Sequence, residues 1–74
     1  CLNIRGNSTA NGAEVIQWTC GAYANEQFTL RGNATSGYEL VARHSGKCVD
    51  VPRASTANSV KLIQYACNGG SNQK

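Results

Sequence analysis

Short stretches of alternating apolar and polar residues recur along the chain and are separated by turn-forming residues. Residues 1–4 and 47–51 alternate large apolar and polar side chains, which is the period-two pattern of a strand with one buried face. Other short segments are rich in β-branched and aromatic residues and end at turn formers. The predicted strands cover residues 1–4, 14–19, 28–30, 38–42, 47–51 and 61–66. No window has a sustained helical period, so the pattern predicts an all-β fold of short strands.

The chain also contains an internal repeat. A shift of 47 positions places residues 1–27 (the first copy) over residues 48–74 (the second copy), and nine of the 27 aligned positions are identical. The identical residues of the first copy are Cys1, Ser8, Thr9, Ala10, Asn11, Ile16, Gln17, Cys20 and Asn25. This similarity predicts two copies of one structural unit. We expect residues 1–30 to form most of one repeat and residues 31–74 most of a second.

The four cysteines occupy matching positions in the two copies. A zinc site would favour Cys-x-x-Cys pairs or histidines at short spacing, and this chain has neither and only His44, so no metal is expected. Of the three possible disulfide connectivities, the repeat selects Cys1 with Cys20 and Cys48 with Cys67, because each copy then closes the same loop. Each bridge would contribute roughly 3 kcal/mol to stability. Disulfides imply an oxidising compartment and hence a secreted protein.

Composition and charge exclude several classes of function. The net charge of +3 is spread along the chain without a basic stripe among stacking aromatics, so nucleic-acid binding is not expected. The apolar stretches fall far short of the roughly 20 residues that a membrane span needs. The four acidic residues show no arrangement beyond their positions in the repeat, and no nucleophile has a partnering base. We therefore expect neither an enzyme nor a cofactor.

Motifs in both copies resemble a known family. They are Gly46-Lys47-Cys48-Val49-Asp50-Val51, Ser55-Thr56-Ala57-Asn58, Ile63-Gln64-Tyr65-Ala66-Cys67-Asn68-Gly69-Gly70 and Asn72-Gln73, with Val15-Ile16-Gln17-Trp18-Thr19-Cys20 and Asn25-Glu26-Gln27-Phe28 in the first copy. In this order they resemble the ricin B-chain type lectins, the family-13 carbohydrate-binding modules. The resemblance spans essentially the whole chain and implies an all-β, β-trefoil fold. The usual Gln-x-Trp ending of that family is altered here to Glu26-Gln27-Phe28.

The resemblance implies one shallow sugar pocket in each copy. In the second copy, Asp50 matches the carboxylate that accepts hydrogen bonds from hydroxyls, Tyr65 the stacking aromatic, and Asn72 the amide that orients the sugar. Gln73 is expected to support Asp50 from behind, and Asn68 matches a further contact in some xylan-binding members. These residue types suit a sugar ring, because the ring offers an apolar C–H face and a rim of hydroxyls.

The first copy departs from this pattern. Trp18 and Asn25 are in place, but Asn3 stands at the carboxylate position and Glu26 at the glutamine position. An amide still accepts a hydrogen bond but lacks the charge that makes such a bond roughly twice as strong. We expect this first site to be weak or vestigial.

Each of these residues also has a purely structural interpretation. Asp50 could cap a turn, and Asn25 and Asn72 could be turn amides of the repeat. Trp18 and Tyr65 could be core aromatics, because alternation with neighbouring isoleucines leaves the direction in which they face undecided.

The family resemblance predicts a secreted, non-catalytic carbohydrate-binding module for galactosides or plant polysaccharides such as xylan and arabinan, of the kind appended to a glycoside hydrolase or belonging to a larger lectin. The alternative is a structural or self-assembling trefoil-repeat protein with vestigial sugar sites. A closed trefoil needs three units, and this chain holds roughly 1.6 units at the observed period. We therefore expect exposed strand edges and a chain that does not fold alone. A longer parent chain or neighbouring copies would supply the remaining repeat.

Overall fold

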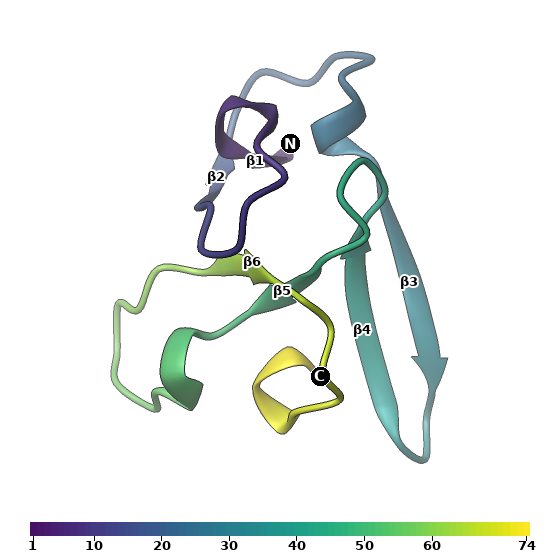
Figure 1. Ribbon diagram of the computed structural model, residues 1–74, viewed down its shortest axis with the longest axis vertical. Helices are drawn as coiled ribbons and strands as arrows, with labels where there is room; N and C mark the ends of the chain where they lie inside the picture. The colour runs from purple at the N-terminus through teal and green to yellow at the C-terminus, as the bar shows by residue number, and fades with distance from the viewer.

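The computed structural model describes residues 1–74 and contains six strands and four single-turn 3₁₀ helices, with no α-helix (Figure 1). The strands are β1 (Leu2–Ile4), β2 (Val15–Gln17), β3 (Phe28–Asn33), β4 (Gly37–Ala42), β5 (Cys48–Asp50) and β6 (Ile63–Tyr65). The 3₁₀ helices are η1 (Arg5–Asn7), η2 (Ala24–Glu26), η3 (Pro52–Ala54) and η4 (Ser71–Gln73). The all-β prediction is confirmed, and every strand overlaps a predicted segment. The 3₁₀ helices were not predicted, because three residues are too few to show a period.

All strand pairs are antiparallel. Strands β1 and β2 form one small sheet, and β3-β4-β5-β6 form a second sheet in sequence order. The long hairpin of β3 and β4 lies to one side of the β1–β2 pair, while β5 and β6 cross beneath that pair (Figure 1). Strand β4 meets β5 only at Val41 and Cys48. The expected division between residues 30 and 31 falls inside β3 and stays a prediction.

The two copies fold alike. The 3₁₀ helices η1 and η3, and η2 and η4, occupy equivalent sequence positions, and the bounds of β1 and β5, and of β2 and β6, agree to within one residue. Even the left-handed turns coincide, since Gly6 has a φ of 64° and its equivalent Arg53 a φ of 54°. A non-glycine residue at positive φ is uncommon, so Arg53 shows that the turn is imposed by the unit and not by glycine alone.

Both predicted disulfides are present. Cys1 is bonded to Cys20 with a Cα–Cα distance of 5.0 Å, and Cys48 to Cys67 with a Cα–Cα distance of 5.1 Å. Each bridge closes a loop with the same sequence separation of 19. The pairing prediction is therefore confirmed.

The two copies are joined around Gln64, which is fully buried. Its Nε2 donates to the carbonyl oxygens of Ser8 (2.9 Å) and Ala10 (2.8 Å), and its Oε1 accepts from Ser45 Oγ (2.9 Å). Backbone hydrogen bonds from Gly12 N to Gln64 O and from Gln64 N to Ala13 O complete the junction. The amide of this fully buried polar side chain is therefore satisfied by hydrogen bonds at the junction.

Little of the chain is buried, as expected of a partial trefoil. Only nine of the 74 residues are buried, and the apolar ones are Ile4, Val41, Ala42 and Cys48. A groove of about 290 Å³ opens between the β3–β4 hairpin and β5, with apolar side chains on its walls. Leu30, which lines it, is 66% exposed. No helix in the structure has the length and apolar character required to cross a bilayer.

Candidate functional site

The second copy gathers the predicted site residues around one pocket of about 380 Å³. Asp50, Tyr65, Asn68 and Asn72 line it. Asp50 pairs with Ile63 and Tyr65 pairs with Cys48 in the antiparallel ladder of β5 and β6, so the side chains of Asp50 and Tyr65 lie diagonally on the same face. Gln73 is not on the pocket wall but lies buried behind Asp50.

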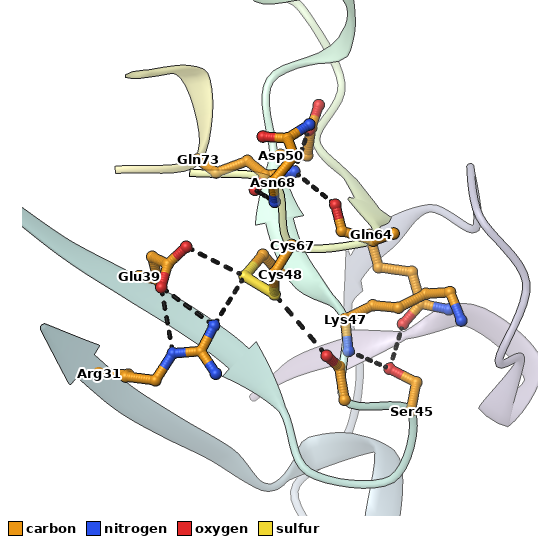
Figure 2. Close-up of a disulfide and its surroundings, with 12 residues drawn as sticks. Arg31, Glu39, Ser45, Lys47, Cys48, Asp50, Gln64, Cys67, Asn68 and Gln73 are labelled. Atoms are coloured by element: carbon orange, nitrogen blue, oxygen red, sulfur yellow. Dashed lines mark hydrogen bonds and ion pairs between the residues drawn. A yellow bond between two sulfur atoms is a disulfide. The ribbon is translucent and has the colours of Figure 1, made fainter. Parts of the chain in front are cut away.

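A hydrogen-bond network holds Asp50 in this position. Gln73 Nε2 donates to Asp50 Oδ2 (2.8 Å) and to Ala66 O (3.1 Å), and Gln73 Oε1 accepts from Asn68 N (3.0 Å). Figure 2 shows Asp50, Gln73 and Asn68 grouped beside the Cys48–Cys67 disulfide. Asp50 makes no other hydrogen bond, which leaves its Oδ1 free to accept one from a ligand.

The structure also decides between several of the competing interpretations. Tyr65 is 43% exposed and Trp18 is 60% exposed, so neither is a core aromatic. Asp50 accepts from a side chain and not from a turn N–H, so it does not cap a turn. The turn interpretation of the two asparagines has support, because Asn25 Nδ2 donates to Ile4 O (2.7 Å) and Asn72 Nδ2 to Val51 O (3.0 Å).

The first copy forms an equivalent pocket of about 390 Å³. Asn3, Trp18 and Asn25 line it, and Glu26 lies behind Asn3. Asn3 Nδ2 donates to Glu26 Oε2 (2.9 Å), and Glu26 Oε1 accepts from Gly21 N (3.0 Å). The first pocket therefore has a side-chain hydrogen bond between its strand residue and its 3₁₀ residue, as the second pocket does.

Three further pocket residues escaped the sequence analysis. Tyr23 lines the first pocket and is 52% exposed, Arg5 lies at the rim of the same pocket, and Arg53 lies at the rim of the second. The repeat hides Tyr23, because its equivalent in the second copy is Gly70. The only sign of Tyr23 in the sequence is that an aromatic residue stands three positions after Cys20.

Glu26 is held in its charged form. The hydrogen bond from the Asn3 amide lowers the pKa of Glu26 below its ordinary value of 4.5. Desolvation opposes this shift, and the Gly21 N–H and the N-terminal ammonium group add smaller decreases.

Protonation of Glu26 should therefore lower the free energy of unfolding. A lowered pKa contributes stability that is fully present above the ordinary pKa and is lost as pH falls through the folded-state value. We expect the carboxyl carbon of Glu26 to titrate below pH 4.5 by NMR, and Asn3→Ala to move the titration toward the ordinary value. An ordinary titration of Glu26 in the unaltered chain would contradict this account.

One cluster has the spacing of metal ligands but not their chemistry. The Glu39 carboxylate and the sulfurs of Cys48 and Cys67 lie within 4.8 Å of one another. Both sulfurs are held in a disulfide and are not thiolates, and Arg31 Nη2 lies 3.0 Å from Glu39 Oε1 (Figure 2). The Glu39 charge is thus balanced by Arg31.

Comparison with protein families identifies the chain. A family model described as a ricin-type β-trefoil lectin domain-like family matches residues 1–65. The chain belongs to the ricin-type β-trefoil lectin family. The family prediction is confirmed, and the chain is a lectin-like domain.

Two solved structures resemble this lectin domain. ThreeFoil, a designed three-fold symmetric protein, matches with a TM-score of 0.92 and 44% identity, over 97% of this chain and 51% of ThreeFoil. The exo-β-1,3-galactanase 1,3Gal43A from Clostridium thermocellum matches with a TM-score of 0.90 and 29% identity, over 97% of this chain and 16% of the galactanase. No curated protein sequence matches the chain. The chain spans about half the length of ThreeFoil, and its fold is a partial β-trefoil.

Proposed function

We propose that this lectin domain is a secreted, non-catalytic module that binds galactosides or plant polysaccharides such as xylan and arabinan through its second-copy pocket. The observation that carries the proposal is the Asp50 carboxylate, which Gln73 holds by one oxygen while the other oxygen stays free beside the exposed ring of Tyr65. The similarity to a protein named as an exo-β-1,3-galactanase favours a galactose-containing ligand and a role as a module appended to an enzyme.

The pocket offers the two kinds of contact that a pyranose requires. A carboxylate oxygen accepts a charge-assisted hydrogen bond from a sugar hydroxyl, and an exposed tyrosine packs against the C–H face of the ring. Asn72 makes one hydrogen bond to the backbone, and its amide keeps one free hydrogen and its Oδ1 for the ligand. A single open pocket of this kind binds weakly, so useful affinity for a polymer would come from several pockets acting together.

Titration with galactose, lactose and xylo-oligosaccharides tests this proposal. We expect amide chemical-shift changes around Asp50, Tyr65 and Asn72 at millimolar sugar, and a loss of affinity of about tenfold or more in Asp50→Asn, because the charge-assisted bond is lost while the shape is kept. Glu14→Gln is a matched control, since Glu14 is an acid outside both sugar pockets. Absence of shifts at millimolar sugar, or equal affinity in Asp50→Asn and the unaltered chain, would overturn the proposal.

A second candidate function is assembly with another repeat of the same type, supplied by a neighbouring copy of this chain. The observation favouring it is a set of hydrogen-bonding groups in the second copy that have no partner. Gly12 N and Val15 N of the first copy donate to the second copy, but their equivalents Ser59 N and Leu62 N have no partner. Gln17, the equivalent of the buried Gln64, is exposed and makes no side-chain hydrogen bond. Another repeat would satisfy these groups as the second copy satisfies the first.

Light scattering over a range of concentrations tests this assembly. The scattering mass should rise above that of one chain with concentration, and Leu62→Lys should return it to one chain, because the lysine places a charge on the apolar groove. A monomeric mass at every concentration would rule the assembly out.

A further inference from the structure

A further pocket, which we call the junction pocket, adjoins the Asp50 pocket where the two copies meet. Its volume is about 470 Å³. The first copy contributes Gly12 and Glu14 to its wall, and most of the remainder comes from η3 and the loop that leads from η3 to β6, at the lower left of Figure 1. Pro52, Arg53 and Ile63 line both the junction pocket and the Asp50 pocket. A ligand in one pocket can therefore extend into the other past these shared residues.

The wall of the junction pocket carries two positive charges that have no ion-pair partner. Arg53 and Lys61 both line it, both are exposed, and neither takes part in an ion pair. Glu14 is the one acidic residue on this wall, and its Oε2 is already 3.2 Å from Nη2 of Arg5. The junction pocket therefore has an excess of positive charge that the chain itself does not neutralise.

The repeat shows how this excess arises. In the first copy, Arg5 and Glu14 pair with each other, and their equivalents in the second copy are Pro52 and Lys61. The acid of the pair is thus replaced by a cation, and the cation by a residue that can neither bind nor neutralise a charge. Lys61 is left without the carboxylate that this position supplies in the first copy.

Arg53 occupies a backbone position that suits glycine better than arginine. Its φ is 54°, in the left-handed region, and its equivalent in the first copy is Gly6, with a φ of 64°. Glycine adopts this conformation freely, whereas the Cβ of any other L-residue makes it unfavourable. Strained residues of this kind gather at ligand-binding sites, so the position favours a function for the Arg53 side chain.

We propose that the junction pocket binds the carboxylate of an acidic sugar residue, a uronate, that is linked to the neutral sugar in the Asp50 pocket. The planar guanidinium of Arg53 can hold a carboxylate with two parallel hydrogen bonds, and Lys61 adds a second positive charge. A uronate is repelled from the Asp50 pocket itself, because Asp50 is a carboxylate. The inference rests on the function proposed above and narrows its ligand to an acidic glycan.

A disaccharide of glucuronic acid linked to galactose tests the inference when it is compared with its carboxyl-reduced form. The two disaccharides differ only in the carboxylate, so the ratio of their affinities measures its contribution. We expect the acidic disaccharide to bind about fivefold more tightly at low salt and to shift the side-chain NMR signals of Arg53 and Lys61. The ratio should fall as salt is added, since both cations are exposed.

Arg53→Gly is the sharpest variant, because glycine is the residue at this position in the first copy. It removes the guanidinium and relieves the left-handed backbone, while the greater freedom of glycine in the unfolded chain acts in the opposite direction. The melting temperature should therefore change little, and the affinity ratio should fall to about one. Lys61→Gln should lower the ratio to about two, whereas Arg43→Gln, which removes an exposed cation outside both pockets, should leave it at about five.

The outcomes separate this inference from the function proposed for the Asp50 pocket. Equal affinities for the two disaccharides, an unchanged ratio in Arg53→Gly, or an equal loss in Arg43→Gln would overturn the inference, even where amide shifts around Asp50 show that the neutral sugar binds. If the carboxyl-reduced disaccharide gives no shifts around Asp50 while the acidic one shifts Arg53 and Lys61, the junction pocket is a uronate site as inferred and the function proposed for the Asp50 pocket fails.

Discussion

Gln64→Ala is expected to lower the free energy of unfolding by about 3 kcal/mol, whereas Gln17→Ala at the equivalent position should change it by less than about 0.5 kcal/mol. Gln64 is fully buried and makes three side-chain hydrogen bonds, two of which join the two copies. Its removal leaves the Ala10 carbonyl with only a long hydrogen bond from Ala13 N (3.4 Å) and opens a cavity. Gln17 is exposed and makes no such bonds.

Urea unfolding of the two variants at the same protein concentration measures this difference. Gln64→Leu separates the hydrogen bonds from the packing, because leucine fills most of the space but cannot donate to the carbonyl oxygens of Ser8 and Ala10. We expect it to destabilise nearly as much as alanine. A neutral effect of Gln64→Leu, or equal effects of the two alanine variants, would contradict the role assigned to this junction.

The contrast between Gln17 and Gln64 shows a limit of the sequence analysis. The repeat aligns them as identical residues, and nothing local distinguishes them. Their environments differ because a loop of the first copy, residues 8–13, covers Gln64, whereas no equivalent loop of a further copy covers Gln17. The strands and the disulfide pairing were predictable, since they depend on local periodicity and on the repeat. The burial of a repeat residue depends on which neighbouring unit is present.

For the pocket residues too, the sequence predicted which residues take part but not how each side chain is oriented. The resemblance selected Asp50, Tyr65 and Asn72, and the structure brings them together at one pocket. The orientation of Trp18 was undecided because its alternation with Ile16 fits either face, and only the folded β1–β2 pair shows that the ring is exposed. In the sequence, Asn3 and Glu26 appear only as two departures from the family pattern. The structure shows that they keep the hydrogen bond that joins Asp50 and Gln73 in the second copy.

Removal of the Cys48–Cys67 bridge is expected to cost about 5 kcal/mol, against about 3 kcal/mol for the Cys1–Cys20 bridge. The two bridges close loops with the same sequence separation of 19, so the entropy that each removes from the unfolded chain is the same. They differ in their surroundings, because Cys48 is fully buried while Cys1 and Cys20 are both exposed. Alanine at position 48 therefore leaves a cavity in addition to the lost cross-link.

Paired alanine variants of each bridge, unfolded in urea, measure these costs against each other. Since small domains are marginally stable, we expect the chain without the Cys48–Cys67 bridge to be largely unfolded at 25 °C.

Mild reduction followed by alkylation and mass spectrometry gives an independent measure, in which the exposed Cys1–Cys20 bridge should open first. The order matters for function, because Cys48 lies two residues before Asp50 and Cys67 directly precedes Asn68, whose N–H donates to Gln73. A chain reduced only at Cys1–Cys20 should therefore keep the second pocket, and sugar-induced shifts around Asp50 should persist. If the Cys48–Cys67 bridge opened first, or if opening Cys1–Cys20 abolished those shifts, burial would not be what protects the second pocket.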